Sequence, residues 1–174
     1  KEYRSGTVFR PLVFEFYDDK TLPAYGSGIH EHQFLLGKSI MAAPVMEFKR
    51  HVANVYLPDC RWYDLRDYQE VPVRGGDYLT SARLTELPPF YLRGGGIFMQ
   101  QNTTGVYRTE DLDHKFSVII GLSDFTEDQK AQASGYLLDS PSYSEEDIFA
   151  NCVEKDCLLK FEATFELKEN EMVL

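Results

Sequence analysis

The most informative run in this chain of 174 residues is Val8-Phe9-Arg10-Pro11-Leu12-Val13-Phe14-Glu15-Phe16. It is short, mostly apolar and rich in β-branched and aromatic residues, which predicts a buried β-strand. Pro11 has no backbone N–H to donate to a sheet, so we expect a local irregularity there. Glu15 alternates with Phe14 and Phe16, and its expected role is an ion pair with Arg10.

The next residues predict a loop, a short helix and a second strand. Residues 17–28 contain two Asp, one Pro and two Gly, a composition typical of a loop. Residues 30–38 can form one or two helical turns with Phe34, Leu35 and Leu36 packed inward. Residues 40–45 are apolar and predict a strand that ends near Pro44.

From about Val52 the sequence predicts only strands. Apolar runs recur at intervals of roughly 8 to 12 residues with turn residues between them, a pattern typical of a β-sandwich. The polar residues 124–132 predict a solvated loop. The expected strands are residues 52–58, 61–65, 78–87, 90–92, 97–99, 116–122 (long and buried), 134–138 and 157–167.

Composition restricts the function. Eighteen Lys and Arg against 28 Asp and Glu give a net charge of -10, which argues against nucleic acid as a partner because phosphate binding needs a basic surface. Hydrophobic residues make up 43% of the chain, as in a packed globular protein. The sequence has no apolar run of 18 residues, so no membrane span is predicted. It does not open with a basic segment followed by an apolar stretch, so no signal peptide is predicted. Because the first residue is Lys1, we expect a processed terminus or a fragment.

The three cysteines are Cys60, Cys152 and Cys157. An odd number gives no complete disulfide framework, and no CxxC pair indicates zinc. Cys152 and Cys157 flank four residues, so they predict either a hairpin disulfide or two reduced thiols. Asn102-Thr103-Thr104 is an N-glycosylation sequon in a polar turn, which makes Asn102 a glycosylation candidate and weakly favours a secretory compartment.

No residue pattern identifies an active site. Each acidic residue is expected on a solvated surface or in a turn, and none has the setting of a glycosidase nucleophile or acid. His30 and His32 lack a third ligand, so no metal site is predicted, and no residue indicates a cofactor. No helix pattern follows Gly94-Gly95-Gly96, so the three glycines are expected to serve close backbone approach or positive φ. Trp62-Tyr63 could stack on a sugar, but core packing is favoured. The acidic candidates are Glu15, Asp18, Asp19, Asp64, Asp139, Glu145, Glu146 and Asp147.

Five segments, in chain order, resemble the carboxy-terminal part of glycoside hydrolase family 31, the α-glucosidase family, and most resemble its subgroup with lysosomal acid α-glucosidase and maltase-glucoamylase. Residues 10–16 resemble the last strand of the family's (β/α)8 barrel. The resemblance extends over about residues 6–140. The other four segments are Gln33-Phe34-Leu35-Leu36-Gly37 with Ala43-Pro44-Val45, Val55-Tyr56-Leu57-Pro58 with Trp62-Tyr63-Asp64, Leu92-Arg93-Gly94-Gly95-Gly96-Ile97, and residues 135–139.

The resemblance implies a mainly β chain with three parts. Residues 1–46 would be the last β/α element of the barrel, residues 47–147 a proximal C-terminal β-sandwich, and residues 148–174 the start of a distal β-domain. In this family the catalytic nucleophile and the acid/base are aspartates upstream of the first segment. No catalytic, cofactor-binding or metal-binding residue therefore maps onto this chain.

The implied function is that of a segment of a retaining α-glucosidase, whose barrel would come from the rest of the polypeptide as a separate or cleaved chain. Its substrate would be an oligosaccharide with terminal α-linked glucose, in a lysosomal, vacuolar or secreted location. Met99, His30-Glu31-His32 and Asp139-Ser140-Pro141-Ser142 depart from the family's pattern. They leave open the alternative of a non-catalytic, family 31-like structural or sugar-binding partner. An independent β-sandwich lectin is disfavoured, because residues 8–16 would stay exposed.

Overall fold

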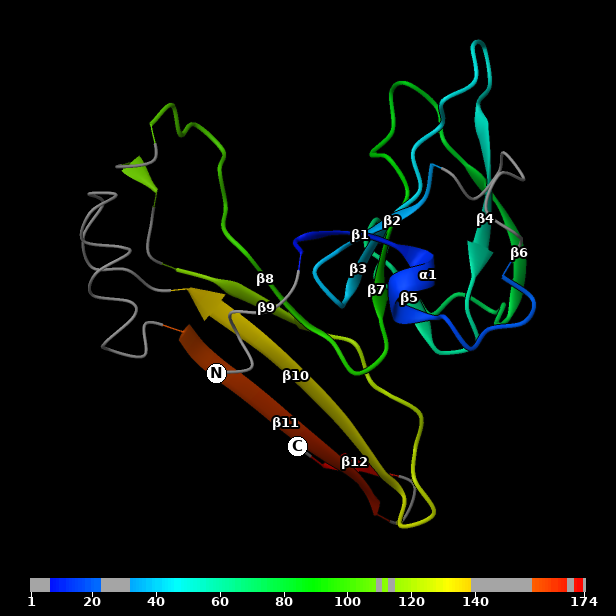
Figure 1. The fold of residues 1–174 in the computed structure, drawn as a ribbon. Coiled ribbons are helices and arrows are strands. Elements are labelled where there is room, and N and C mark those ends of the chain that lie inside the picture. The colour runs from blue at the N-terminus through cyan, green and yellow to red at the C-terminus, as the bar shows by residue number, and fades with distance from the viewer. Residues whose placement is uncertain are drawn as a thin grey trace. The chain divides into compact units, whose positions relative to one another are not determined.

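The computed structural model describes residues 7–22, 32–108, 111–112, 115–138, 158–168 and 171–173. The chain divides into two compact units. Unit 1 is Lys1–Gly96 with Gly121–Asp124, and unit 2 is Ile97–Ile120 with Phe125–Leu174. Figure 1 labels the elements of both units in chain order.

Unit 1 contains two antiparallel sheets. Its five-stranded sheet has the order β1-β2-β3-β7-β5, and its second sheet pairs β4 with β6. The elements of unit 1 are β1 (Phe9–Pro11), α1 (Leu12–Glu15), β2 (Phe34–Leu36), β3 (Ile40–Ala42), β4 (Val52–Leu57), β5 (Trp62–Asp64), β6 (Gly76–Ser81) and β7 (Phe90–Arg93).

Unit 2 contains a hairpin and a three-stranded sheet. The hairpin joins β8 and β9, and the sheet has the order β10-β11-β12. β10 and β11 pair antiparallel from Lys130↔Glu166 to Leu138↔Leu158. The elements of unit 2 are β8 (Ile97–Gln100), β9 (Ser117–Ile120), β10 (Lys130–Leu138), β11 (Leu158–Lys168) and β12 (Glu171–Val173).

The prediction of a mainly β chain is confirmed, because every strand pair among the described residues is antiparallel and the described helix is a single turn. The strands β1 and β2 pair antiparallel. The predicted boundary between residues 46 and 47 falls between β3 and β4 in the chain. It would assign β3 and β7 to different domains, although these two strands pair in one sheet. The three-part division by residue number stays a prediction. Within the described residues, we find no helix with the length and apolarity that crossing a bilayer requires.

The predicted buried strand over residues 8–16 is wrong in extent and burial. Only Phe9–Pro11 forms a strand, and Leu12–Glu15 turns into α1. Pro11 explains the change, because its ring fixes φ (−57°) and it gives no N–H to a ladder. The expected irregularity at Pro11 is therefore confirmed. Val8 and Phe14 are 76% and 64% exposed, and of the run only Leu12 is fully buried.

The predicted helical turns over residues 30–38 are also wrong where the structure describes them. Phe34–Leu36 is β2, which pairs with β1 and with β3. Gly37 has φ +63° and its N–H donates to the Val8 carbonyl oxygen. The tight connection through Gly37 and the pairing on both sides outweigh the weak local preference of these residues for a helix.

Three predictions in the later strands need correction. The expected strand over residues 78–87 ends early, because β6 is Gly76–Ser81. The expected long buried strand over residues 116–122 is shorter, Ser117–Ile120, and its first half is exposed. The expected loop over residues 124–132 ends early, because β10 begins at Lys130. Polar side chains at the start of β10 lie on an exposed sheet face, which a composition argument does not distinguish from a loop.

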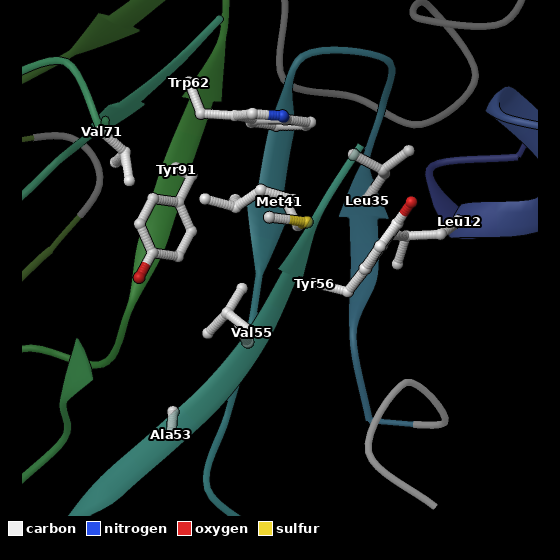
Figure 2. Close-up of a cluster of buried hydrophobic side chains, with 11 residues drawn as sticks. Leu12, Leu35, Met41, Ala53, Val55, Tyr56, Trp62, Val71 and Tyr91 are labelled. Carbon is white, nitrogen blue, oxygen red and sulfur yellow. The ribbon is translucent and has the colours of Figure 1, made fainter. Parts of the chain in front are cut away.

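Both sheets of unit 1 contribute to one hydrophobic core (Figure 2). Leu35 and Met41 come from neighbouring strands of the five-stranded sheet, Val55 comes from β4, and Trp62 and Tyr91 come from β5 and β7. These five side chains are each 0% exposed. Ala53 and the last three residues of β4 are buried, which places this strand against the core.

Candidate functional site

The segment of β1 and α1 is joined to β7 by an ion-pair cluster. Glu15 pairs with Arg10 through one carboxylate oxygen, and Arg93 Nη1 lies 3.8 Å from the other oxygen. The side chains of Arg10 and Glu15 are 14% and 16% exposed. Arg93 also lies over the ring of Phe16, 4.6 Å from its centroid. The expected ion pair of Glu15 with Arg10 is confirmed, and the cluster makes Glu15 a structural residue.

Cys60 lies beside this cluster as a protonated thiol. Burial raises the pKa of Cys60 to about 11, and the nearby Arg93 only partly opposes that rise. A thiol with so high a pKa carries almost no thiolate at neutral pH, so Cys60 has no nucleophilic character there. Cys152 and Cys157 lie outside the described residues, and their disulfide stays a prediction.

Gln33 connects the sheet of β2 to β4. Its side-chain amide donates to the Tyr56 carbonyl oxygen (3.0 Å) and its amide oxygen accepts from the Tyr56 N–H (2.8 Å). Gln33 is 4% exposed. Because the amide satisfies both backbone groups of one residue in β4, it replaces a strand partner at this position.

The Tyr56 hydroxyl extends the connection to the segment after α1. It donates to Asp19 Oδ2 (2.7 Å) and forms a short hydrogen bond with the Thr21 hydroxyl. Burial raises the pKa of Tyr56 to about 12. Burial also acts to raise the pKa of Asp19, but the hydrogen bonds from Thr21 and Tyr56 outweigh it and leave that pKa below its usual value.

A second polar group lies between β5, β6 and β7. The Arg66 guanidinium donates to Asp64 Oδ1 through Nε (2.9 Å) and to the Thr80 hydroxyl through Nη2 (2.6 Å). Asp64 and Thr80 are each 7% exposed. Burial raises the pKa of Tyr91, on β7, to about 12. Arg66, Asp64 and Thr80 satisfy one another, so Asp64 is held as the partner of an arginine. The buried Tyr91 hydroxyl has no hydrogen-bond partner among the described residues.

The Gly94-Gly95-Gly96 segment meets the chain where it returns to unit 1. Gly95 has φ +88°, its N–H donates to the Gly121 carbonyl oxygen (2.8 Å), and the Gly121 N–H donates to Gly96 (2.9 Å). A Cβ at Gly94 would lie 2.7 Å from the Leu122 carbonyl oxygen. The prediction that this run serves close backbone approach and positive φ is confirmed.

The aromatic pair Trp62-Tyr63 packs into the protein. Trp62 is 0% exposed and its indole N–H donates to the Pro58 carbonyl oxygen (3.0 Å). The Tyr63 hydroxyl donates to the Leu122 carbonyl oxygen (3.0 Å). Core packing, the favoured interpretation, is confirmed for Trp62, and a fully buried ring cannot stack on a sugar.

The described residues offer no catalytic arrangement of carboxylates and no group of three potential metal ligands. Glu15 and Asp64 are held by arginines and Asp19 by hydroxyls. A surface hollow of about 400 Å³ is lined by His51, Arg83, Leu84 and Thr85, none of which is acidic. His32 is exposed. The remaining candidates lie outside the described residues, namely His30, Asp139, Glu145, Glu146 and Asp147.

Sequence reasoning missed the cross-links that Gln33 and Arg93 make. Both residues belong to the segments that carry the family resemblance, and that was the available signal. The spacing of residues in the sequence does not identify the partner of Gln33, because Gln33 and Tyr56 lie 23 residues apart. In the described residues the motif positions thus form a connected scaffold.

Comparison with known proteins agrees with this scaffold. A sequence profile described as "Glycosyl hydrolase family 31 C-terminal domain" matches residues 5–98. Human intestinal sucrase-isomaltase is 36% identical over 92 residues, 53% of this chain and 5% of that protein. An alpha-glucosidase of Hordeum vulgare is 31% identical over 142 residues, 78% of this chain and 15% of that protein.

Further similarities concern compartment and fold. A lysosomal acid alpha-glucosidase of Tetrahymena pyriformis is 22% identical over 161 residues, 85% of this chain and 17% of that protein. The names of these relatives include a lysosomal and an intestinal protein. The structure of a family 31 dextranase from Flavobacterium johnsoniae, 22% identical, has a TM-score of 0.68 and covers 95% of this chain and 18% of that chain. This last similarity concerns the fold.

The chain spans between 5% and 17% of the length of these curated relatives. The predicted resemblance is confirmed, since the profile match extends over more than half of the chain and includes four of the five quoted segments. The matched region contains β1 to β7, and therefore all elements of unit 1. The chain belongs to glycosyl hydrolase family 31 and contains the C-terminal domain of that family.

Proposed function

We propose that this chain is a C-terminal segment of a retaining α-glucosidase and that it supports a (β/α)8 barrel supplied by the rest of the polypeptide. The observation that carries the proposal is that the polar motif residues are occupied by structural contacts: Glu15, Gln33 and Asp64 each hold a partner within this chain. The name of the barley relative supports α-glucosidase activity. The substrate would be an oligosaccharide with terminal α-linked glucose.

A retaining glycosidase needs two carboxyl groups about 5 to 5.5 Å apart. One attacks the anomeric carbon while the other protonates the leaving oxygen, and the second then activates water. We assign both carboxyl groups to the barrel. The role of this chain is to hold the end of the barrel in place, which orients the catalytic groups without contact with the substrate.

Exposed apolar side chains around β1 and α1 support a partner at this place. Val8, Phe9, Val13, Phe14 and Tyr17 are between 41% and 76% exposed. So many apolar side chains in ten residues are unusual on a free surface. The proposed arrangement makes residues 1–46 the last β/α element of the barrel, residues 47–147 the proximal β-sandwich, and residues 148–174 the start of a distal β-domain.

The stereochemistry of hydrolysis tests the chemical part. The complete protein, purified from its own cells, is incubated with maltose, and the anomer of the first glucose released is followed by proton NMR. We expect the α-anomer first, with mutarotation later. Release of the β-anomer would contradict a retaining mechanism. Intact protein that hydrolyses no α-glucoside would instead favour the alternative, a non-catalytic structural or sugar-binding partner.

A pair of surface variants tests the supporting role. Phe14→Asp places a charge on the exposed segment, and we expect the rest of the enzyme to lose α-glucosidase activity and co-purification with this segment. Leu84→Asp is the matched control, because Leu84 is 96% exposed and lies between β6 and β7. Equal activity of the two variants would count against a partner at β1 and α1.

A further inference from the structure

The turn after β8 places the sequon Asn102-Thr103-Thr104 on the surface of unit 2. All three residues are exposed, as is Gly105 after them. The Thr104 N–H donates to Asn102 Oδ1 (3.0 Å), and the Val106 N–H donates to the Thr103 carbonyl oxygen (3.1 Å). The sequon is therefore an Asx turn followed by a second tight turn.

This geometry presents the Asn102 amide for modification. The Asx turn uses the amide oxygen of Asn102 and leaves its nitrogen, Nδ2, free of that bond. The same turn bends the side chain of Asn102 toward Thr104, whose hydroxyl the sequon requires. Gly105 has φ +76°, with nothing within 4 Å of where a Cβ would stand. A glycan attached to Asn102 therefore meets open space beside Gly105, in the second turn.

We propose that Asn102 is an occupied N-glycosylation site. The donor would be a lipid-linked pyrophosphate oligosaccharide. The bond between its anomeric carbon and the pyrophosphate oxygen breaks, a bond from that carbon to Asn102 Nδ2 forms, the lipid pyrophosphate leaves, and Nδ2 loses one proton. No oxidant or reductant is needed. A lysosomal or secreted route, which the relatives fit, would carry the protein past the transferase that performs this step.

A glycan here would also cover apolar surface. Tyr107 is 94% exposed, and Phe116 and Val118 are 42% and 54% exposed. β8 and β9 pair up to Gln100↔Ser117, so the chain opposite the turn is the one that carries Phe116. A bulky hydrophilic group at Asn102 would therefore stand at the end of the hairpin where these side chains face water, and would limit self-association there.

Peptide mapping of the complete protein from its own cells tests the proposal. The protein is digested after a peptide N-glycosidase has acted in heavy-oxygen water, which converts a glycosylated asparagine to labelled aspartate. We expect the label on Asn102. An Asn102 peptide that is found unlabelled overturns the proposal, whether or not other sequons of the protein are occupied.

Sequon variants of the complete protein give a second, independent measurement. Asn102→Gln and Thr104→Ala should each migrate with the mass of one glycan less than the unmodified sequence. Thr104→Ser is the matched control, because it keeps the sequon and should keep the glycan. Thr104→Ala leaves Asn102 in place, so it separates loss of the glycan from loss of the Asx turn. Identical migration of all four proteins overturns the proposal.

Discussion

Glu15 lies between two guanidinium groups with most of its side chain removed from water. Replacing it by glutamine keeps its shape but leaves Arg10 and Arg93 without their anion. We expect Glu15→Gln to lower the free energy of unfolding by about 1 to 3 kcal/mol. Urea unfolding of the 174-residue chain, followed by the fluorescence of its single tryptophan, Trp62, measures this loss within unit 1.

The matched control for Glu15 is Glu47. Glu47 pairs with Arg50, but both side chains are 61% exposed. An exposed pair contributes about 0 to 1 kcal/mol, so Glu47→Gln should leave the urea midpoint almost unchanged. Equal effects of the two substitutions would show that the cluster around Glu15 contributes no more than a surface ion pair.

Three buried acids make alkaline pH destabilising. Burial raises the pKa of Tyr56 and Tyr91 from 10.0 to about 12 and that of the Cys60 thiol from 9.0 to about 11. The unfolded chain therefore loses these protons at lower pH than the folded chain does. Their contribution to stability is complete below pH 9 and is lost as the pH rises to about 12.

The free energy of unfolding measured against pH checks this expectation. Tyr91→Phe removes one of the three groups, so the fall in stability above pH 10 should become less steep. Tyr107→Phe is the control, because its ring is 94% exposed, and it should leave the slope unchanged. An unchanged slope in Tyr91→Phe would mean that this hydroxyl ionises as readily in the folded chain as in the unfolded one.

The end of β7 depends on the close approach of the Gly94 backbone to neighbouring segments. A methyl group at Gly94 would lie 2.7 Å from the Leu122 carbonyl oxygen and 2.9 Å from Arg61 Cβ. We expect Gly94→Ala to push these segments apart and to lower the free energy of unfolding by about 1 to 3 kcal/mol. Urea unfolding with Trp62 fluorescence is again the measurement.

Gly76, the first residue of β6, is the matched control for Gly94. A Cβ there meets only Val73 Cγ1 at 3.7 Å and the Arg74 carbonyl oxygen at 4.0 Å, and its φ lies outside the left-handed region. Gly76→Ala should be neutral or stabilising, by about 0.4 to 1 kcal/mol, through the unfolded chain. A loss at Gly76 as large as at Gly94 would refute close approach as the cause.

The elements differ in how well the sequence predicts them. β4 and β11 were predicted nearly to their ends, because long alternating runs with turn residues beside them identify a strand. β2 was predicted as helix, since three apolar residues between a polar segment and Gly37 carry no period. Its identity comes from pairing with β1 and β3, and such tertiary pairing lies outside any local pattern.

The candidate site was less accessible to sequence reasoning than the strands. The Glu15–Arg10 pair was predicted, and its two residues lie five positions apart on one segment. The third member, Arg93, comes from β7, and only the fold brings it within 3.8 Å. The resemblance to family 31 identified the right segments, but the contacts between them follow from the topology of unit 1.

At the scale of the whole chain, unit 1 is completed by residues that follow an excursion into unit 2. Gly121, Leu122, Ser123 and Asp124 accept hydrogen bonds from Gly95, Tyr63, Arg61 and Arg74 respectively. A chain ending at residue 96 lacks all of them. We expect residues 1–96 to unfold at lower urea concentration than residues 1–124, measured by Trp62 fluorescence. Equal midpoints would show that the returning segment adds no stability.

The reciprocal glycine contact has a consequence for how members of this family can diverge. Because Gly121 N–H reaches the Gly96 carbonyl oxygen at 2.9 Å, the detour from residue 97 to residue 120 begins and ends at one spot. The entropy of closing a loop grows only with the logarithm of its length. Insertions and deletions inside the detour therefore leave unit 1 undisturbed, so length polymorphism among homologues should concentrate between these two glycines.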